Sequence, residues 1–233
     1  LRKSTFNRKC AYMLYHWRVQ SKFHEHNPDS KPYAQTAGKI VLQRHFERTG
    51  LQVDVSDSEL PFRYRNRYIN EATPKVSIVI PTGPFAAAAA LPYFGLEKTT
   101  YQNYDITLVE NNSTEQETFA YYDRIQDQNE KIKVVTWPGT GFNYSAICNY
   151  GAAHCDGEIL LFLNNDTVII NGDWLDSMVG FFARPEVGIV GAKLLFPDNL
   201  VQHGGVWVSA DHVGYLSDML SDKDGGYMET MRY

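Results

Sequence analysis

The sequence predicts an α/β fold in which helices flank a mostly parallel β-sheet. Two observations carry this prediction. Short apolar runs of the continuous kind, typical of buried strands, occur after Pro74. Stretches of helical character separate these runs, and strands that alternate with helices favour right-handed βαβ units. The composition agrees, since 43% of the 233 residues are hydrophobic and 21% are charged, as in an ordinary globular domain with a full core.

The first 73 residues form a helical or irregular N-terminal extension in this interpretation. One helix is predicted over residues 33–49, and Gly50 is its C-terminal stop. Its apolar stripe consists of Ala37, Ile40, Val41, Leu42 and Phe46. The flanking segments NPDSKPY and ELPFRYRNRY are predicted to be linkers. A second domain is expected over residues 74–233.

The second domain begins with four predicted strands, at residues 75–81, 105–110, 132–137 and 158–164. Helices are predicted between them over residues 86–99, 115–129 and 143–154. A helix over 173–183 and a strand over 187–196 follow, and the chain then becomes Gly-rich. This order predicts a doubly wound parallel sheet.

Charge and composition exclude several classes of protein. The formal net charge of −5 argues against nucleic acid as the main partner. The longest strongly apolar run, Ile159 to Leu163, is far too short to span a bilayer, and the first 18 residues lack the apolar core of a signal peptide. Three cysteines without metal-type spacing fit reduced thiols in a cytoplasmic protein.

Ligands of open α/β sheets bind outside the carboxyl ends of the strands, so the residues that end each predicted strand are the candidates for function. Three of the four ends are polar or Gly-rich. At the second, Glu110 and Asn112 precede Ser113 and Thr114. This stretch either caps the next helix through a hydroxyl or presents Glu110, from an open crevice, to a ribose or base. The glycine fingerprints of dinucleotide and P-loop sites are absent, so the phosphates of a nucleotide need another partner.

The fourth strand ends on Asn164, Asn165 and Asp166. One carboxylate flanked by amide oxygens suits a Mg²⁺ or Mn²⁺ ion that a substrate diphosphate completes. The alternative is that Asp166 caps a turn, where aspartate is common. His203 is a further candidate ligand, although a histidine beside two glycines is more often a loop residue.

Several segments together resemble the inverting glycosyltransferases of family two, which have the GT-A fold. They are PKVSIVIPT, EKTTYQNYDITLVENNST, GFNYSAICNYGAAHCDGEILLFLNNDTVI and GDWLDSMVGFFARPEVGIVGAKLLFPDNLVQHGGV. The resemblance covers residues 74 to 215, in the family's order and spacing. It is closest to bacterial enzymes of cell-wall and capsular polysaccharide synthesis, of the rhamnosyltransferase-like kind.

The resemblance implies roles for individual residues. Pro81 and Thr82 would lie beside the nucleotide base, and Glu110, where the family usually has Asp, would contact the nucleoside. Asp166 matches the last residue of the family's Asp-x-Asp motif and would bind the cation, Mn²⁺ or Mg²⁺. The remaining donor contacts would come from amides, namely Asn112, Asn143, Asn149, Asn164 and Asn165.

The implied reaction is transfer of a sugar, with inversion, from a UDP- or dTDP-sugar to a saccharide or lipid-linked saccharide acceptor. It would take place in the cytoplasm, at the inner face of the membrane. The family's catalytic base lies beyond a position that corresponds to Tyr233, so we expect a piece of a longer protein with no identified base and little transfer activity. A non-catalytic nucleotide-sugar-binding or scaffold module is the main alternative. A nucleotidyltransferase is disfavoured because its basic, Gly-rich loop is missing after the first strand.

Overall fold

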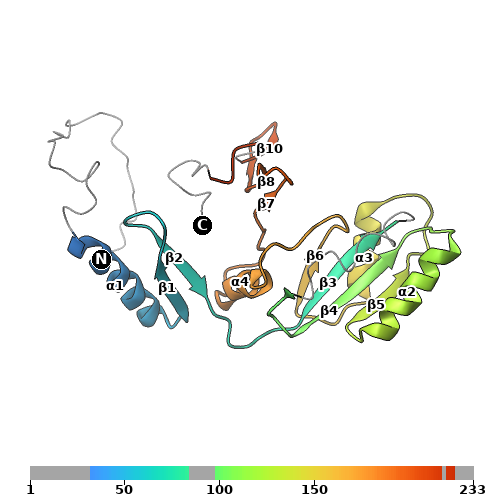
Figure 1. Ribbon diagram of the computed structural model, residues 1–233, viewed down its shortest axis with the longest axis horizontal. Coiled ribbons are helices and arrows are strands. Elements are labelled where there is room, and N and C mark those ends of the chain that lie inside the picture. Colours follow the sequence, from blue (N-terminus) through green and yellow to red (C-terminus); the bar gives the residue numbers. More distant parts are fainter. Residues whose placement is uncertain (1–31, 84–97, 217–218, 224–233) are drawn as a thin grey trace.

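The structure is a computed structural model that describes residues 32–83, 98–216 and 219–223. It confirms the predicted α/β class. Figure 1 shows a helix with a hairpin at one end, a parallel sheet with helices, and a group of short strands that stands apart from the sheet. The helix predicted over 86–99 falls almost entirely outside the described residues. In the described part of the chain, no helix has the length and apolar character needed to cross a membrane.

The N-terminal unit, residues 32–69, consists of helix α1 (Pro32–Thr49) and a hairpin of β1 (Val53–Asp57) and β2 (Tyr64–Tyr68). The helix ends as predicted, because Gly50 adopts a left-handed φ of 70° and the next amide, of Leu51, bonds back to the carbonyl of Phe46. The hairpin replaces the predicted linker. Aromatic and polar side chains alternate along β2 with exposed arginines, a strand pattern that the sequence interpretation missed.

The predicted apolar stripe of α1 is wrong except at one position. Phe46 is buried, whereas Ala37, Ile40 and Val41 are exposed and Leu42 is half-buried. The helix is therefore held to the hairpin by Phe46 near its end and by polar contacts near its start, where the Tyr64 hydroxyl donates to the Gln35 carbonyl at 2.7 Å and the Gln35 amide donates to Asp57 at 2.7 Å.

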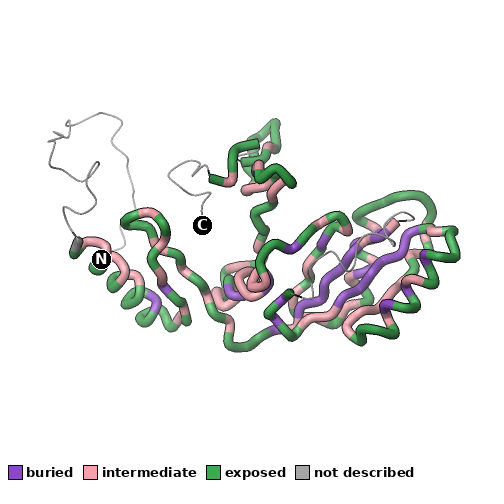
Figure 2. The backbone as a smooth tube through the Cα atoms, viewed as in Figure 1, coloured by how far each residue is buried: buried purple, intermediate pink, exposed green. Residues whose placement is uncertain are grey.

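The four predicted strands of the second domain form one parallel sheet. They are β3 (Val76–Thr82), β4 (Tyr104–Glu110), β5 (Ile132–Thr136) and β6 (Ile159–Phe162), in the order β5-β4-β3-β6. β3 and β4 are buried almost throughout, which explains their unbroken apolar sequences (Figure 2).

Helices cover both faces of the sheet. On one face, α2 (Gln116–Gln128) and α4 (Trp174–Gly180) bury Tyr122, Ile125, Leu175 and Val179 against the β3 and β4 side chains. On the other, α3 (Tyr144–Ala153) packs on Val79 and Val109. Its Gly151 permits this close approach, because a Cβ there would lie 2.5 Å and 2.6 Å from methyl carbons of these valines. All three helices were predicted within a few residues.

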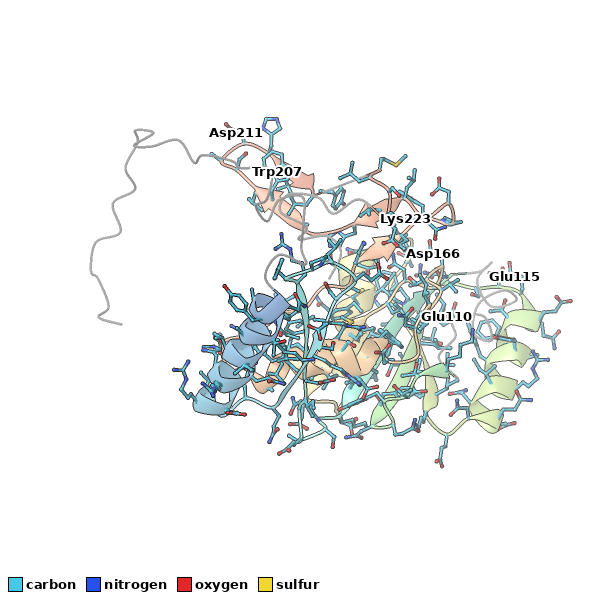
Figure 3. All side chains as sticks on the ribbon, turned by 60° about the vertical axis from the view of Figure 1, so that its left-hand side comes forward. Glu110, Glu115, Asp166, Trp207, Asp211 and Lys223 are labelled. Atoms are coloured by element: carbon cyan, nitrogen blue, oxygen red, sulfur yellow. The ribbon has the colours of Figure 1, made fainter. Side chains whose placement is uncertain are left out.

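The chain after α4 differs from the prediction. The strand expected over 187–196 is reduced to β7 (Leu194–Leu195), which pairs with β8 (Val201–His203). Two glycines, Gly188 and Gly191, interrupt the apolar run. A Cβ placed at either position would have no atom within 4 Å, so this part of the run packs against nothing there. A second hairpin, β9 (Val206–Val208) and β10 (Val213–Tyr215), carries Trp207 and, at its tip, Asp211 (Figure 3).

The N-terminal unit packs against α4 and the 3₁₀ turn Phe181–Ala183 that follows it. The ring of Tyr68 lies between those of Phe46 and Phe181, at centroid distances of 5.8 and 5.1 Å. The carbonyl oxygen of Tyr68 would be 2.1 Å from a Cβ at position 180, so only Gly180 permits this contact. The backbone of β2 therefore lies in direct contact with the backbone of α4.

Candidate functional site

The carboxyl ends of the parallel strands meet at one edge of the sheet, called here the carboxyl edge. Register brings the ends together, since Thr82 pairs with Glu110 and Glu110 pairs with Thr136. Glu110 and Asp166, labelled in Figure 3, both come from segments that leave the sheet at this edge. The strand-end residues that the sequence singled out are therefore neighbours in the fold.

Glu110 is buried, which corrects the expectation of a carboxylate in an open crevice. Its side chain is 1% exposed, and its Oε1 accepts a hydrogen bond of 2.5 Å from the backbone N–H of Ser113. The carboxylate turns back onto its own chain because the residues after β4 form a tight turn there. Capping by Ser113 or Thr114 is also wrong, since the N-cap of α2 is Glu115 and no side chain bonds to the helix amides from it.

A buried polar cluster lies beside Glu110. The hydroxyl of Tyr122, on α2, donates to Thr82 Oγ1 at 2.9 Å, and Thr82 donates in turn to the carbonyl of Val109 at 3.3 Å. Burial, and to a smaller extent the negative charge of Glu110, raises the pKa of Tyr122 above its ordinary value. Thr82 is thereby occupied inside the protein, and the neighbouring Pro81 is half-buried. Tyr122 was not predicted, because a tyrosine in the middle of a helix carries no sequence signal of this kind.

Asn112 is exposed at the carboxyl edge and joins two of its loops. Its backbone has a left-handed φ of 58°, a conformation that asparagine tolerates better than most residues. Its amide nitrogen donates to the side chain of Asn111 at 2.5 Å and to the carbonyl of Gly141 at 3.3 Å. The end of β4 is thus tied to the loop that leads from β5 to α3.

The two asparagines predicted on α3 occupy different places. Asn143 caps the helix, since its Oδ1 accepts a hydrogen bond of 3.1 Å from the N–H of Ala146. The amino end of α3 follows the carboxyl edge, and helix amino ends favour anions such as phosphates. Asn149 is exposed six residues further along, which is about 9 Å along the helix axis. Only Asn143 therefore adjoins the edge directly.

The segment after β6 presents one free carboxylate. Asn164 accepts a hydrogen bond of 3.2 Å from the hydroxyl of Tyr144, and its own carbonyl accepts from the N–H of Thr167. Asp166 is exposed in the turn that results, and among the described residues its carboxylate has no hydrogen-bond or ion-pair partner. Burial raises the pKa of Tyr144, so this residue acts as a neutral donor. Asp166 is not needed to close the turn.

The donor set at this edge fits a hard divalent cation. Asp166 is a single carboxylate, and the amide of half-buried Asn165 lies next to it in the chain. No group of three histidine, cysteine or acidic side chains that could enclose a metal occurs among the described residues. A site of this composition suits Mg²⁺ or Mn²⁺ that takes its other ligands from water and from substrate phosphates.

Comparison with known proteins gives matches over most of the chain. A sequence model of the family described as "Glycosyl transferase family 2" matches residues 88–204. The O-antigen biosynthesis protein RfbC of Myxococcus xanthus is 41% identical over 84% of this chain, and the uncharacterized protein y4gI of Sinorhizobium fredii is 38% identical over 84%. The chain spans 15% and 22% of their respective lengths.

Among solved structures, a mannosyltransferase from Pyrobaculum calidifontis, in complex with GDP-Man and Mn²⁺, matches with a TM-score of 0.45. It is 18% identical in sequence, and the match covers 69% of this chain and 44% of that one.

Proposed function

Because the chain belongs to glycosyl transferase family 2, we propose that it binds a nucleotide-diphosphate-sugar at the carboxyl edge and serves its transfer, with inversion, to a saccharide acceptor. The donor would be a UDP- or dTDP-sugar. The acceptor would be a saccharide, free or lipid-linked, of a bacterial surface polysaccharide made on the cytoplasmic side of the membrane. The 41% identity to a protein named for O-antigen biosynthesis supports this class of product.

The observation that carries the proposal is the convergence of the family's strand-end residues on one edge. Pro81, Thr82 and Glu110 end adjacent strands there, and Asn112 is exposed beside them. In the proposal Asn112 faces the nucleoside, while Glu110 holds the turn that presents it. Pro81 and Thr82 form the floor beneath the base.

The diphosphate would lie between the amino end of α3 and the segment after β6. Asn143 fixes the first turn of α3 by capping it. Asp166 would hold the cation, assisted by the amides of Asn164 and Asn165, and Asn149 would be a peripheral contact. Bound there, a cation would neutralise charge that develops on the departing diphosphate. The protein's own part is to keep Asp166 free and exposed for this purpose.

The test is a calorimetric titration of UDP with and without Mn²⁺. Asp166→Asn should abolish the Mn²⁺-dependent gain in affinity, because the hard cation then has only neutral oxygens and water. Asn165→Ala should lower the gain only in part. Asp211→Asn, which removes an exposed carboxylate from the outlying hairpin, is the matched control and should leave the gain unchanged. Equal gains in the wild type and Asp166→Asn would contradict the metal site, because Asp166 is not needed to close the turn and the substitution removes only the carboxylate.

A transfer assay with radiolabelled sugar separates an enzyme from a binding module. Under the proposal, transfer to the acceptor depends on Asp166. If a protein that contains this domain binds the nucleotide but transfers no sugar, the scaffold alternative is favoured.

A further inference from the structure

A cavity of about 410 Å³ lies between the N-terminal unit and the segment after α4. This volume falls within the range of a few hundred Å³ that small-molecule sites occupy, and such sites are frequent where two structural units meet. α1 and the hairpin contribute His45, Phe46, Thr49, Leu51 and Tyr68, and the segment after α4 contributes Arg184, Pro185 and Glu186. We call it the junction cavity.

The junction cavity is separate from the carboxyl edge. β2 leads through residues 69–75 into the start of β3, so the N-terminal unit adjoins the end of the sheet at which the strands begin (Figure 1). A nucleotide at the carboxyl edge is at the opposite end of these strands. A ligand of the junction cavity would therefore be distinct from a nucleotide at the carboxyl edge.

The apolar part of the lining comes from Phe46, Leu51, Tyr68 and Pro185. The polar part is neutral as a whole. Arg184 donates from Nε and Nη2 to the same oxygen of Glu186, at 2.9 and 2.6 Å, so the two charges cancel. The guanidinium is also held above the Tyr68 ring, 5.8 Å from its centroid. Donors and acceptors are thus fixed beside an aromatic wall.

This chemistry distinguishes between classes of ligand. A phosphate or carboxylate would require an unpaired cation, and Glu186 would repel it. A purely apolar molecule would leave the remaining donors of Arg184 and acceptors of Glu186 unused on its side of the cavity. A sugar ring has an apolar C–H face and neutral hydroxyls that both donate and accept. We propose that the junction cavity binds a neutral saccharide.

A role follows if the proposed function also holds. A saccharide held at the junction cavity would be a distal unit of a long acceptor whose growing end lies at the carboxyl edge. Saccharide binding itself does not depend on that role, so the two proposals fail separately.

The experiment uses the full chain and follows neutral disaccharides, maltose and lactose, by saturation-transfer NMR and calorimetry. Arg184→Met keeps the unbranched stem of the side chain but removes the guanidinium and its donors, and Glu186→Ala removes the acceptor oxygens. Each should weaken disaccharide binding by about fivefold or more, because about 1 kcal/mol per hydrogen bond is lost. Arg67→Met is the matched control, since Arg67 is exposed on β2 and is not part of the cavity. It should bind as the wild type does.

Three results would overturn the inference. They are absence of disaccharide binding to the wild type, binding that Arg184→Met and Glu186→Ala leave unchanged, and preference for glucose 6-phosphate over the neutral sugars. In a parallel titration, the affinity for UDP should be the same for Arg184→Met and the wild type. Failure of the wild type to bind UDP would count against the proposed function and leave the saccharide site standing.

Discussion

Replacing Glu110 separates two roles for this residue, the support of a turn and direct contact with a nucleoside. In Glu110→Ala the N–H of Ser113 loses its carboxylate partner. Hydrogen bonds to charged groups contribute about 1.5–3 kcal/mol. The buried methylene adds about 0.8 kcal/mol, and relief from burying a charge offsets part of the total. We expect a net loss of about 2 kcal/mol.

For a domain of this size a loss of 2 kcal/mol lowers Tm by about 4–8 °C, which differential scanning calorimetry resolves easily. Glu110→Gln keeps an oxygen acceptor for Ser113 in a side chain of the same length, so its Tm should fall by less than half as much. Equal Tm values for Glu110→Ala and the wild type would refute the view that the carboxylate holds the turn.

Binding of UDP to the same variants completes the experiment. If Glu110 acts by holding the turn, Glu110→Gln should bind UDP nearly as tightly as the wild type, whereas Glu110→Ala should bind it much more weakly. A Glu110→Gln variant that is stable but binds UDP tenfold more weakly would mean that the carboxylate itself contacts the nucleoside. The positioning role would then be wrong.

Three further substitutions probe the packing and charges of the fold. Gly151→Ala should destabilise the protein by up to about 2 kcal/mol in chemical denaturation, because overpacking costs about 1–3 kcal/mol and the gain of about 1 kcal/mol in helix propensity offsets only part of it. Gly180→Ala places a methyl group against the Tyr68 carbonyl and should release the N-terminal unit, seen as new proteolytic cleavage between residues 69 and 75. Lys75, hydrogen-bonded to Asp156 at 2.6 Å, lowers the pKa of that carboxyl, so the pair stabilises the fold above about pH 4 and ceases to do so as pH falls through the lowered pKa. Lys75→Met should flatten this acid dependence of the denaturation midpoint, and an unchanged profile would contradict the pairing.

The strands of the sheet could be predicted because burial on both faces leaves a direct trace in the sequence. Val76 to Ile80 is nearly uniform in its apolar character, and every one of these residues is buried. The hairpin of the N-terminal unit was missed for the converse reason. Its strand Tyr64–Tyr68 has no core face of aliphatic residues, and its pairing partner is defined only by the turn between them.

The arrangement of the candidate site residues could be predicted at the level of segments and less well at the level of side chains. Parallel strands bring their carboxyl ends to the same edge of the sheet, regardless of the conformation of the loops. The convergence of Glu110 and Asp166 on one edge therefore followed from topology. The burial of Glu110 did not, because it depends on the φ angles of the residues after β4, including the left-handed Asn112. The capping role of Asn143 could not be predicted either, because it depends on the residue at which α3 begins.

The pairing of β3 with β6 has a consequence for synthesis on the ribosome. Val76 lies opposite Ile159, so β3, one of the two inner strands of the sheet, lacks one neighbour until 83 more residues have been made. At about 5–20 residues per second this takes roughly 4–17 s, far longer than the microseconds in which a chain of this size collapses. During that interval β3 is an open edge of unpaired amides and carbonyls, the kind of surface that recruits other chains. Translation speed over residues 76–162, rather than diffusion of the chain, therefore sets how long a nascent molecule is exposed to misassembly.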